Sequence, residues 1–198
     1  MKPAAPLLAF VLLAACESST RAAPEAPPMA AVSTGDSLRV APPPSPPAVT
    51  PGVPEAMRGV VEAHNARRAA HCAPPLVWSP EVAAVAQRHA DQLRGGGCNL
   101  THSSGPYGEN LYGASPAGGA TPAAVVDSWY GEVAQYNFAR PGFGMDTGHF
   151  TQVVWRATSR VGCGVARCAD SEVWVCNYEG PGNVEGQYRE NVLPVGCR

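Results

Sequence analysis

The stretch from Gly148 to Trp155 reads Gly-His-Phe-Thr-Gln-Val-Val-Trp and carries the strongest structural signal in the chain. From Phe150 to Arg156 the side chains fall into two alternating sets, and a period of two residues predicts a β-strand. Further along, residues 161–167 and 173–178 predict two more strands, with a loop over residues 180–186. The C-terminal part of the chain is therefore expected to form a sheet.

Upstream of this stretch the apolar residues recur at helical spacing. A first helix is predicted over residues 55–70. A second begins at Ser79, a good N-cap that is followed by a proline at the first helical position, and it ends at the glycines 95–97. A third begins after Pro122 and carries an apolar stripe that extends to Tyr136. Helices first and strands later predict an α+β domain, with an antiparallel sheet covered by helices.

The sequence of residues 1–54 predicts an export signal followed by a tether. Residues 1–16 combine a positive start with an apolar core too short to span a bilayer as a mature helix, which predicts a cleaved signal peptide. The segment ending Leu13-Ala14-Ala15-Cys16 resembles a bacterial lipobox, so Cys16 is the expected lipid anchor in the cell envelope. The alternative is an ordinary signal peptide that leaves Cys16 as a plain thiol. Residues 17–54, rich in Ala, Pro, Ser and Thr, predict a disordered tether, and residues 55–198 the folded domain.

The remaining cysteines and the charge balance restrict the class of protein. Six cysteines besides Cys16 form an even set, which in an exported chain implies disulfides, but spacing alone leaves all pairings open. Zinc-cluster binding has no support, because no Cys-x-x-Cys pair occurs. The formal net charge is −2 with no basic run, so nucleic acid is not an expected partner.

Four polar residues fall where an ordinary core would not place them. Glu132 lies on the same predicted helix face as two large aromatic residues, and a carboxylate facing inward must be paired or hydrogen-bonded. His149 stands at the entry to the predicted strand, while His102 and Glu109 lie in a turn-rich loop over residues 102–110. Two imidazoles and two carboxylates in one cleft would suit zinc or another divalent cation. The alternative is a hydrogen-bond network that only fixes the loops.

Several segments together resemble the CAP superfamily, which contains cysteine-rich secretory proteins, wasp venom antigens and plant pathogenesis-related proteins. Residues 148–155 resemble its first signature, and residues 176–178, followed by Gly182-Asn183, resemble its second. Segments 102–103, 108–111 and 129–132 are also similar to family segments, and residues 186–194 resemble the fungal lipid-binding branch. Two residues depart from the family pattern: Gly180 replaces a proline, and Trp174 replaces an aliphatic or smaller aromatic residue.

The resemblance implies a CAP-type α-β-α sandwich with a central antiparallel sheet. It also implies a tetrad of His102, Glu109, Glu132 and His149, in which the histidines bind a divalent metal, usually zinc, and the glutamates lie beside them. The resemblance further implies the disulfides Cys98–Cys168 and Cys163–Cys176. This leaves Cys72 and Cys197, which we expect to pair; the alternative is that one is free or forms an intermolecular bond. Three further histidines are expected to be structural or surface residues: His64, His71 and His89.

Three functions stay open at this point. The first is a binding module for a lipid, a sterol-like molecule or a cell-surface partner. The second is a zinc-dependent hydrolase acting on peptide or cell-wall substrates, with Glu109 or Glu132 as the general base. The third is a structural envelope protein in which the tetrad only stabilises the fold. No nucleophile motif is present, so an enzyme is not the favoured interpretation.

Overall fold

The computed structural model describes residues 52–197, so the predicted signal peptide, Cys16 and nearly all of the predicted tether lie outside the described residues. The helices are α1 (Val60–Ala70), α2 (Pro80–Gly95), α3 (Pro122–Gly131), α4 (Gly148–Val154) and α5 (Tyr188–Asn191), with short 3₁₀ helices η1 (Glu55–Met57) and η2 (Glu132–Gln135). The strands are β1 (Val77–Trp78), β2 (Gly108–Ala114), β3 (Arg160–Arg167) and β4 (Glu172–Glu179). Within residues 52–197 no helix is both long and apolar enough to cross a bilayer.

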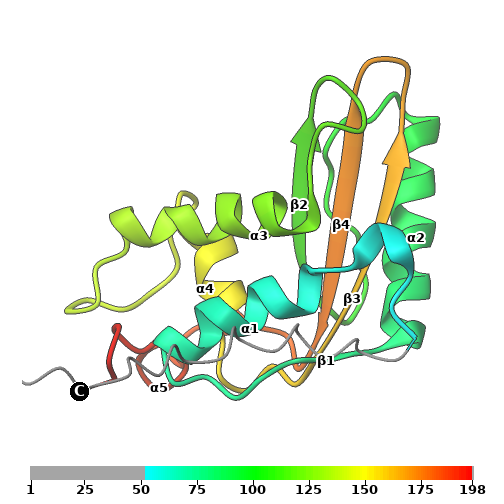
Figure 1. Cartoon of the computed structure of the whole chain (residues 1–198). Coiled ribbons are helices and arrows are strands. Elements are labelled where there is room, and N and C mark those ends of the chain that lie inside the picture. The colour runs from blue at the N-terminus through cyan, green and yellow to red at the C-terminus, as the bar shows by residue number, and fades with distance from the viewer. Residues whose placement is uncertain (1–51, 198) are drawn as a thin grey trace, which may run out of the picture. The chain divides into compact units, whose positions relative to one another are not determined.

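The sheet has the strand order β1-β3-β4-β2 and separates two groups of helices. β2 and β3 each pair with β4 in antiparallel fashion, and only the two-residue strand β1 runs parallel to its neighbour β3. Figure 1 shows α2 along one side of the sheet, with α1, α3 and α4 gathered on the other. The fold is therefore an α-β-α sandwich with a mainly antiparallel sheet.

The side chains of β4 alternate between two hydrophobic clusters, as a strand buried on both faces requires. Trp174, Cys176 and Tyr178 belong to the larger cluster, which α1, α3 and α4 share. Val173 and Val175 belong to a smaller cluster with the apolar face of α2. β3 presents glycines to the same helix, and a Cβ atom on Gly164 would lie only 2.4 Å from the Cα atom of Gln87. This absence of side chains lets the backbone of α2 lie directly on the sheet.

The structure corrects the prediction for residues 150–156. Residues 150–154 belong to the helix α4 rather than to a strand, residues 155 and 156 follow it, and every residue from Phe150 to Trp155 is buried. A short segment buried on all sides has no solvent-exposed face, so its apolar pattern does not distinguish a strand from a helix. Two smaller differences concern helix ends: α1 begins at Val60 after a separate 3₁₀ turn, and α3 ends at Gly131 before η2.

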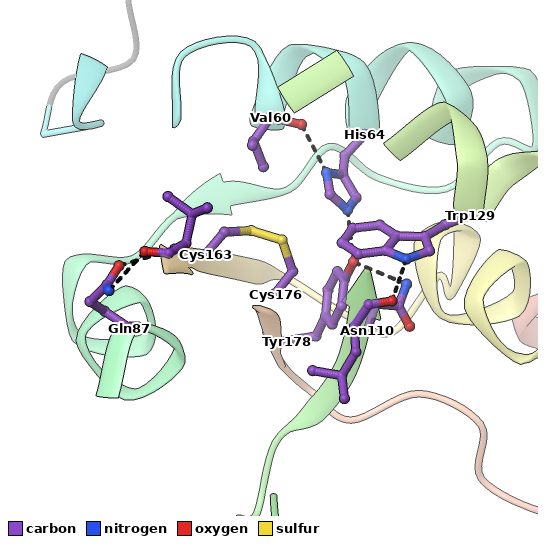
Figure 2. The surroundings of a disulfide bond; sticks show 10 residues. Val60, His64, Gln87, Asn110, Trp129, Cys163, Cys176 and Tyr178 are labelled. Atoms are coloured by element: carbon purple, nitrogen blue, oxygen red, sulfur yellow. Dashed lines mark hydrogen bonds between the residues drawn. A yellow bond between two sulfur atoms is a disulfide. The ribbon is translucent and has the colours of Figure 1, made fainter. Parts of the chain in front are cut away.

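Three disulfides cross-link the described chain. Cys163 and Cys176 are directly opposite each other on β3 and β4, and Figure 2 shows their bond beside Tyr178. Cys98–Cys168 joins the loop after α2 to the β3–β4 connection. Cys72–Cys197, which leaves neither cysteine free, joins the end of α1 to the C-terminal tail.

Candidate functional site

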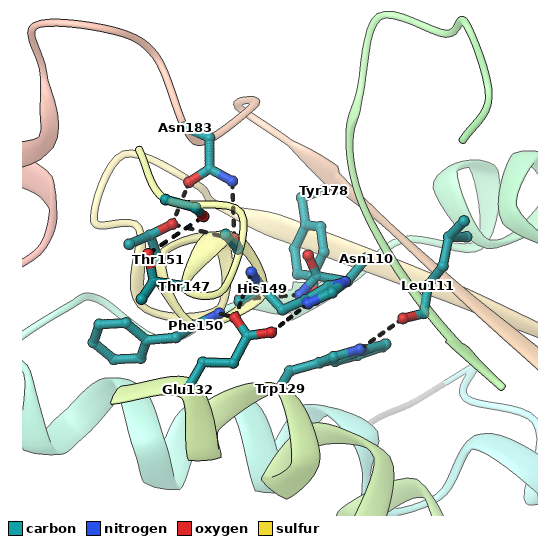
Figure 3. Close-up of polar contacts among 12 residues, drawn as sticks. Asn110, Leu111, Trp129, Glu132, Thr147, His149, Phe150, Thr151, Tyr178 and Asn183 are labelled. Atoms are coloured by element: carbon teal, nitrogen blue, oxygen red, sulfur yellow. Dashed lines mark hydrogen bonds and ion pairs between the residues drawn. The ribbon is translucent and has the colours of Figure 1, made fainter. Parts of the chain in front are cut away.

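His149 and Glu132 form the first half of the candidate site, at the start of α4. Glu132 Oε1 lies 2.6 Å from His149 Nδ1, and Glu132 Oε2 accepts hydrogen bonds from the backbone N–H groups of His149 (2.9 Å) and Phe150 (3.0 Å). Figure 3 shows the carboxylate aimed at the first turn of the helix, whose unpaired N–H groups attract negative charge. The ring of His149 also stacks on Trp129, with ring centroids 6.4 Å apart. The imidazole is therefore held from two sides.

His102 and Glu109 form the second half and repeat the same chemistry. Glu109 Oε1 lies 2.9 Å from His102 Nδ1 and accepts the N–H of Ser103 at 2.9 Å, while Oε2 accepts the Ser103 hydroxyl at 2.6 Å. The Glu109 side chain is only 6% exposed, whereas the His102 side chain is 62% exposed. Glu109 lies on β2 rather than in the predicted loop, so the sheet fixes its position.

The two halves meet at one small cavity of about 130 Å³. His102, Glu109 and His149 line it, whereas Glu132 is not part of the wall and contacts His149 instead. The other lining residues come from β2, from the segment before α4, from the first residue of α4 and from the loop after β4: Asn110, Phe143, Met145, Gly148 and Asn183. Asn183 closes the wall by donating to the carbonyl of Gly148 at 2.9 Å.

The donor atoms around this cavity suit a divalent cation. Each Nδ1 faces a carboxylate oxygen, so in the neutral imidazole the proton lies on Nδ1 and Nε2 keeps a lone pair that can bind a metal. A carboxylate that orients a histidine through Nδ1 is the usual arrangement around protein-bound zinc. Within residues 52–197 no cluster of three or more His, Cys, Asp or Glu ligands occurs, so the protein would supply two nitrogens and leave other positions to water or ligand.

The same carboxylates are largely engaged by the protein itself. Glu109 and Glu132 each accept three hydrogen bonds from their own protein neighbours. A general base must present a lone pair to its substrate or to an attacking water. The geometry therefore favours an orienting role for both glutamates and gives the hydrolase hypothesis no specific support.

The other three histidines lie outside the candidate site, two in the core and one on α2. His64 and His71 are fully buried on α1 and at its end, and each bonds a backbone carbonyl and a tyrosine hydroxyl. His89 lies on α2 beside a neighbouring cavity that it shares with His102. Sequence reasoning assigned no role to Asn110 or Tyr178, which connect His64 to the cleft, although both lie in segments that resemble the family pattern, residues 108–111 and 176–178.

Comparisons with known proteins agree with the α-β-α sandwich fold. A family model described as CAP, the cysteine-rich secretory protein family, matches residues 61–178. The chain belongs to this family. Protein PRY2 of Saccharomyces cerevisiae is 44% identical over 69% of this chain and 40% of its own length, and pathogenesis-related protein 1 of Arabidopsis thaliana is 40% identical over 67% of this chain and 81% of its own. The chain thus spans about two fifths of the yeast relative.

A solved structure extends the likeness to three dimensions. The crystal structure of NaASP2 with Zn²⁺ has a TM-score of 0.59 and 26% identity, covering 73% of this chain and 89% of that one. The protein is therefore a CAP-domain protein of the pathogenesis-related type. Three disulfides and membership of a secretory family agree with the predicted export, because disulfides persist in oxidising compartments.

Proposed function

We propose that this domain is an exported ligand-binding module whose cleft takes a divalent cation between His102 and His149. One observation carries the proposal: both imidazoles line the same cavity, and each has its Nδ1 already engaged by a carboxylate. The similar structure of NaASP2 is a crystal structure with Zn²⁺, which supports this choice of ion. With two protein nitrogens, the affinity should be lower than that of four-ligand structural zinc sites.

Zinc titration of the chelator-stripped protein tests the cation site. We expect one Zn²⁺ per chain, with binding lost in both His102→Ala and His149→Ala. His89→Ala is the matched control, because His89 is a partly exposed histidine outside the 130 Å³ cavity. Stoichiometric binding that survives both cleft substitutions would place the ion elsewhere and refute the proposal.

We propose further that the rim of the same cleft captures an apolar ligand of the lipid or sterol-like class. Two of the lining side chains are large, hydrophobic and exposed: Phe143 is 55% and Met145 is 88% exposed. Large apolar side chains gathered at the mouth of a cavity mark interaction sites. A cell-surface partner that inserts an apolar group would use the same feature.

Binding of sterols and fatty acids to the delipidated protein tests the apolar rim. We expect Phe143→Ser and Met145→Ser to weaken capture. Val77→Ser should leave capture unchanged, because Val77 is 59% exposed but lies on the sheet edge at β1. Equal losses in all three variants would indicate nonspecific adsorption. If chelators lower thermal stability without changing any ligand binding, the structural-envelope hypothesis replaces this one.

We also propose that the exported protein is held at the cell envelope by a lipid on Cys16. PRY2 and pathogenesis-related protein 1 come from a yeast and a plant, so the bacterial lipoprotein hypothesis depends on the motif from Leu13 to Cys16 alone. Cys16→Ser should move the protein from the membrane fraction to the soluble fraction. An unchanged distribution would favour the ordinary signal peptide.

A further inference from the structure

A chain of hydrogen bonds connects the buried core to the candidate cation cleft. His64 Nδ1 lies 2.8 Å from the carbonyl of Val60, and His64 Nε2 lies 2.8 Å from the Tyr178 hydroxyl. That hydroxyl lies 3.3 Å from Asn110 Nδ2, which also donates to the carbonyl of His149 at 3.2 Å. Figures 2 and 3 show the two ends of this chain, which crosses from α1 through β4 and β2 to α4.

The chemistry of the partners fixes the direction of every bond in this chain. The Val60 carbonyl can only accept, so His64 Nδ1 carries the proton and Nε2 accepts the proton of the Tyr178 hydroxyl. Full burial keeps His64 neutral, because it lowers the pKa of this residue to about 4. The Tyr178 oxygen is then left to accept from Asn110, whose amide nitrogen must also face the His149 carbonyl. No other orientation of the Asn110 side chain satisfies both neighbours.

Asn110 is thereby the link between the two halves of the cleft. Its backbone follows Glu109, which orients His102, and its side chain binds the main chain of His149. Asn110 is 1% exposed, so solvent does not compete with these bonds. We propose that Tyr178 and His64, acting through Asn110, are positioning residues that set the separation of the two cleft imidazoles and hence the affinity for a divalent cation. This inference rests on the proposed cation site.

The chain contains a matched control for this idea. His71, which directly follows α1, places its Nε2 3.0 Å from the Tyr130 hydroxyl and its Nδ1 2.6 Å from the carbonyl of Leu193. The chemistry is the same, a buried histidine between a carbonyl and a tyrosine. The difference is that neither Tyr130 nor His71 lines the cavity or bonds a residue that does.

The experiment compares Tyr178→Phe with Tyr130→Phe in the full chain. Zn²⁺ affinity is measured by calorimetry below the unfolding temperature of each variant, and the visible spectrum of bound Co²⁺ reports ligand geometry. We expect Tyr178→Phe to weaken Zn²⁺ binding by about tenfold or more, as loss of an outer partner of a metal site does, and to shift the Co²⁺ bands. Tyr130→Phe should match the unmodified chain in both measurements.

Three results would overturn the inference in distinguishable ways. If the unmodified chain binds no Zn²⁺, the proposed cation site fails and the inference fails with it. If the unmodified chain binds but Tyr178→Phe binds equally well, the cation site stands and the positioning role is refuted. Equal losses in both variants would mean that general destabilisation weakens binding. Should Tyr178→Phe not fold, Asn110→Ala breaks the same link, and affinity retained there is refutation as well.

Discussion

Acidification should destabilise this domain through His64. This side chain is fully buried, and desolvation, reinforced by the charge of Arg68, lowers its pKa from 6.5 to about 4. Between pH 6.5 and pH 4, His64 binds a proton in the unfolded chain but not in the folded chain. The contribution of His64 to the free energy of unfolding is therefore present above pH 6.5 and is lost as the pH falls toward 4. A difference of about 2.5 pKa units at 1.36 kcal/mol each corresponds to about 3 kcal/mol.

Urea denaturation at several pH values between 7 and 4 measures this loss. The unmodified protein is compared with His64→Gln, whose amide does not titrate, so acid-sensitive groups common to both proteins cancel in the difference. We expect the free energy of unfolding to fall by about 3 kcal/mol more in the unmodified protein than in the variant. Parallel pH dependences for the two proteins would refute the reasoning, because they would show that His64 titrates alike in the folded and unfolded states.

Three further variants test buried hydrogen bonds, a disulfide and close packing. Arg68→Met leaves four backbone carbonyls without the hydrogen bonds that the guanidinium now donates to them, and it should lower the free energy of unfolding by about 3 kcal/mol or more in chemical denaturation. A smaller loss would mean that water replaces the guanidinium. Replacing Cys72 and Cys197 by serine opens a loop with a sequence separation of 125 and should cost about 4 kcal/mol, seen as a lower Tm; an unchanged Tm would refute it. Gly164→Ala should cost about 1–3 kcal/mol, because its Cβ would lie 2.4 Å from the backbone of α2. Gly131→Ala, with nothing within 4 Å, is its control and should cost nothing.

Local signals in the sequence were sufficient to predict a helix cap and two strands of the sheet. Ser79 caps α2 as predicted, with its hydroxyl accepting the N–H of Val82 at 3.2 Å. The two strands predicted over residues 161–167 and 173–178 correspond to β3 and β4, because each is long and apolar and lies between turns. The helix α4 could not be predicted in this way, since burial of all its residues from Phe150 to Val154 removes the polar face that would show a helical period.

The candidate cleft could be predicted only in part. Its histidines and glutamates lie on separate elements, so spacing alone could not bring them together, and the resemblance to a family supplied their grouping. The link through Asn110 and Tyr178 escaped prediction for a different reason. Polar side chains that satisfy one another inside a core leave no pattern along the chain, because their partners are distant in sequence: His64 and Tyr178 are 114 residues apart.

The bond between Cys72 and Cys197 also determines how the protein would carry mechanical load. A pull applied through the residues before α1 and at the last residue of the chain would be transmitted from one cysteine directly to the other. The sheet and helices α2 to α5 lie within this covalent ring and would bear no tension while the bond stays oxidised. While the disulfide is intact, only α1 and the residues before it could be extended by the pull. Reduction of the Cys72–Cys197 bond would allow the residues between the two cysteines, which are most of the domain, to be extended as well.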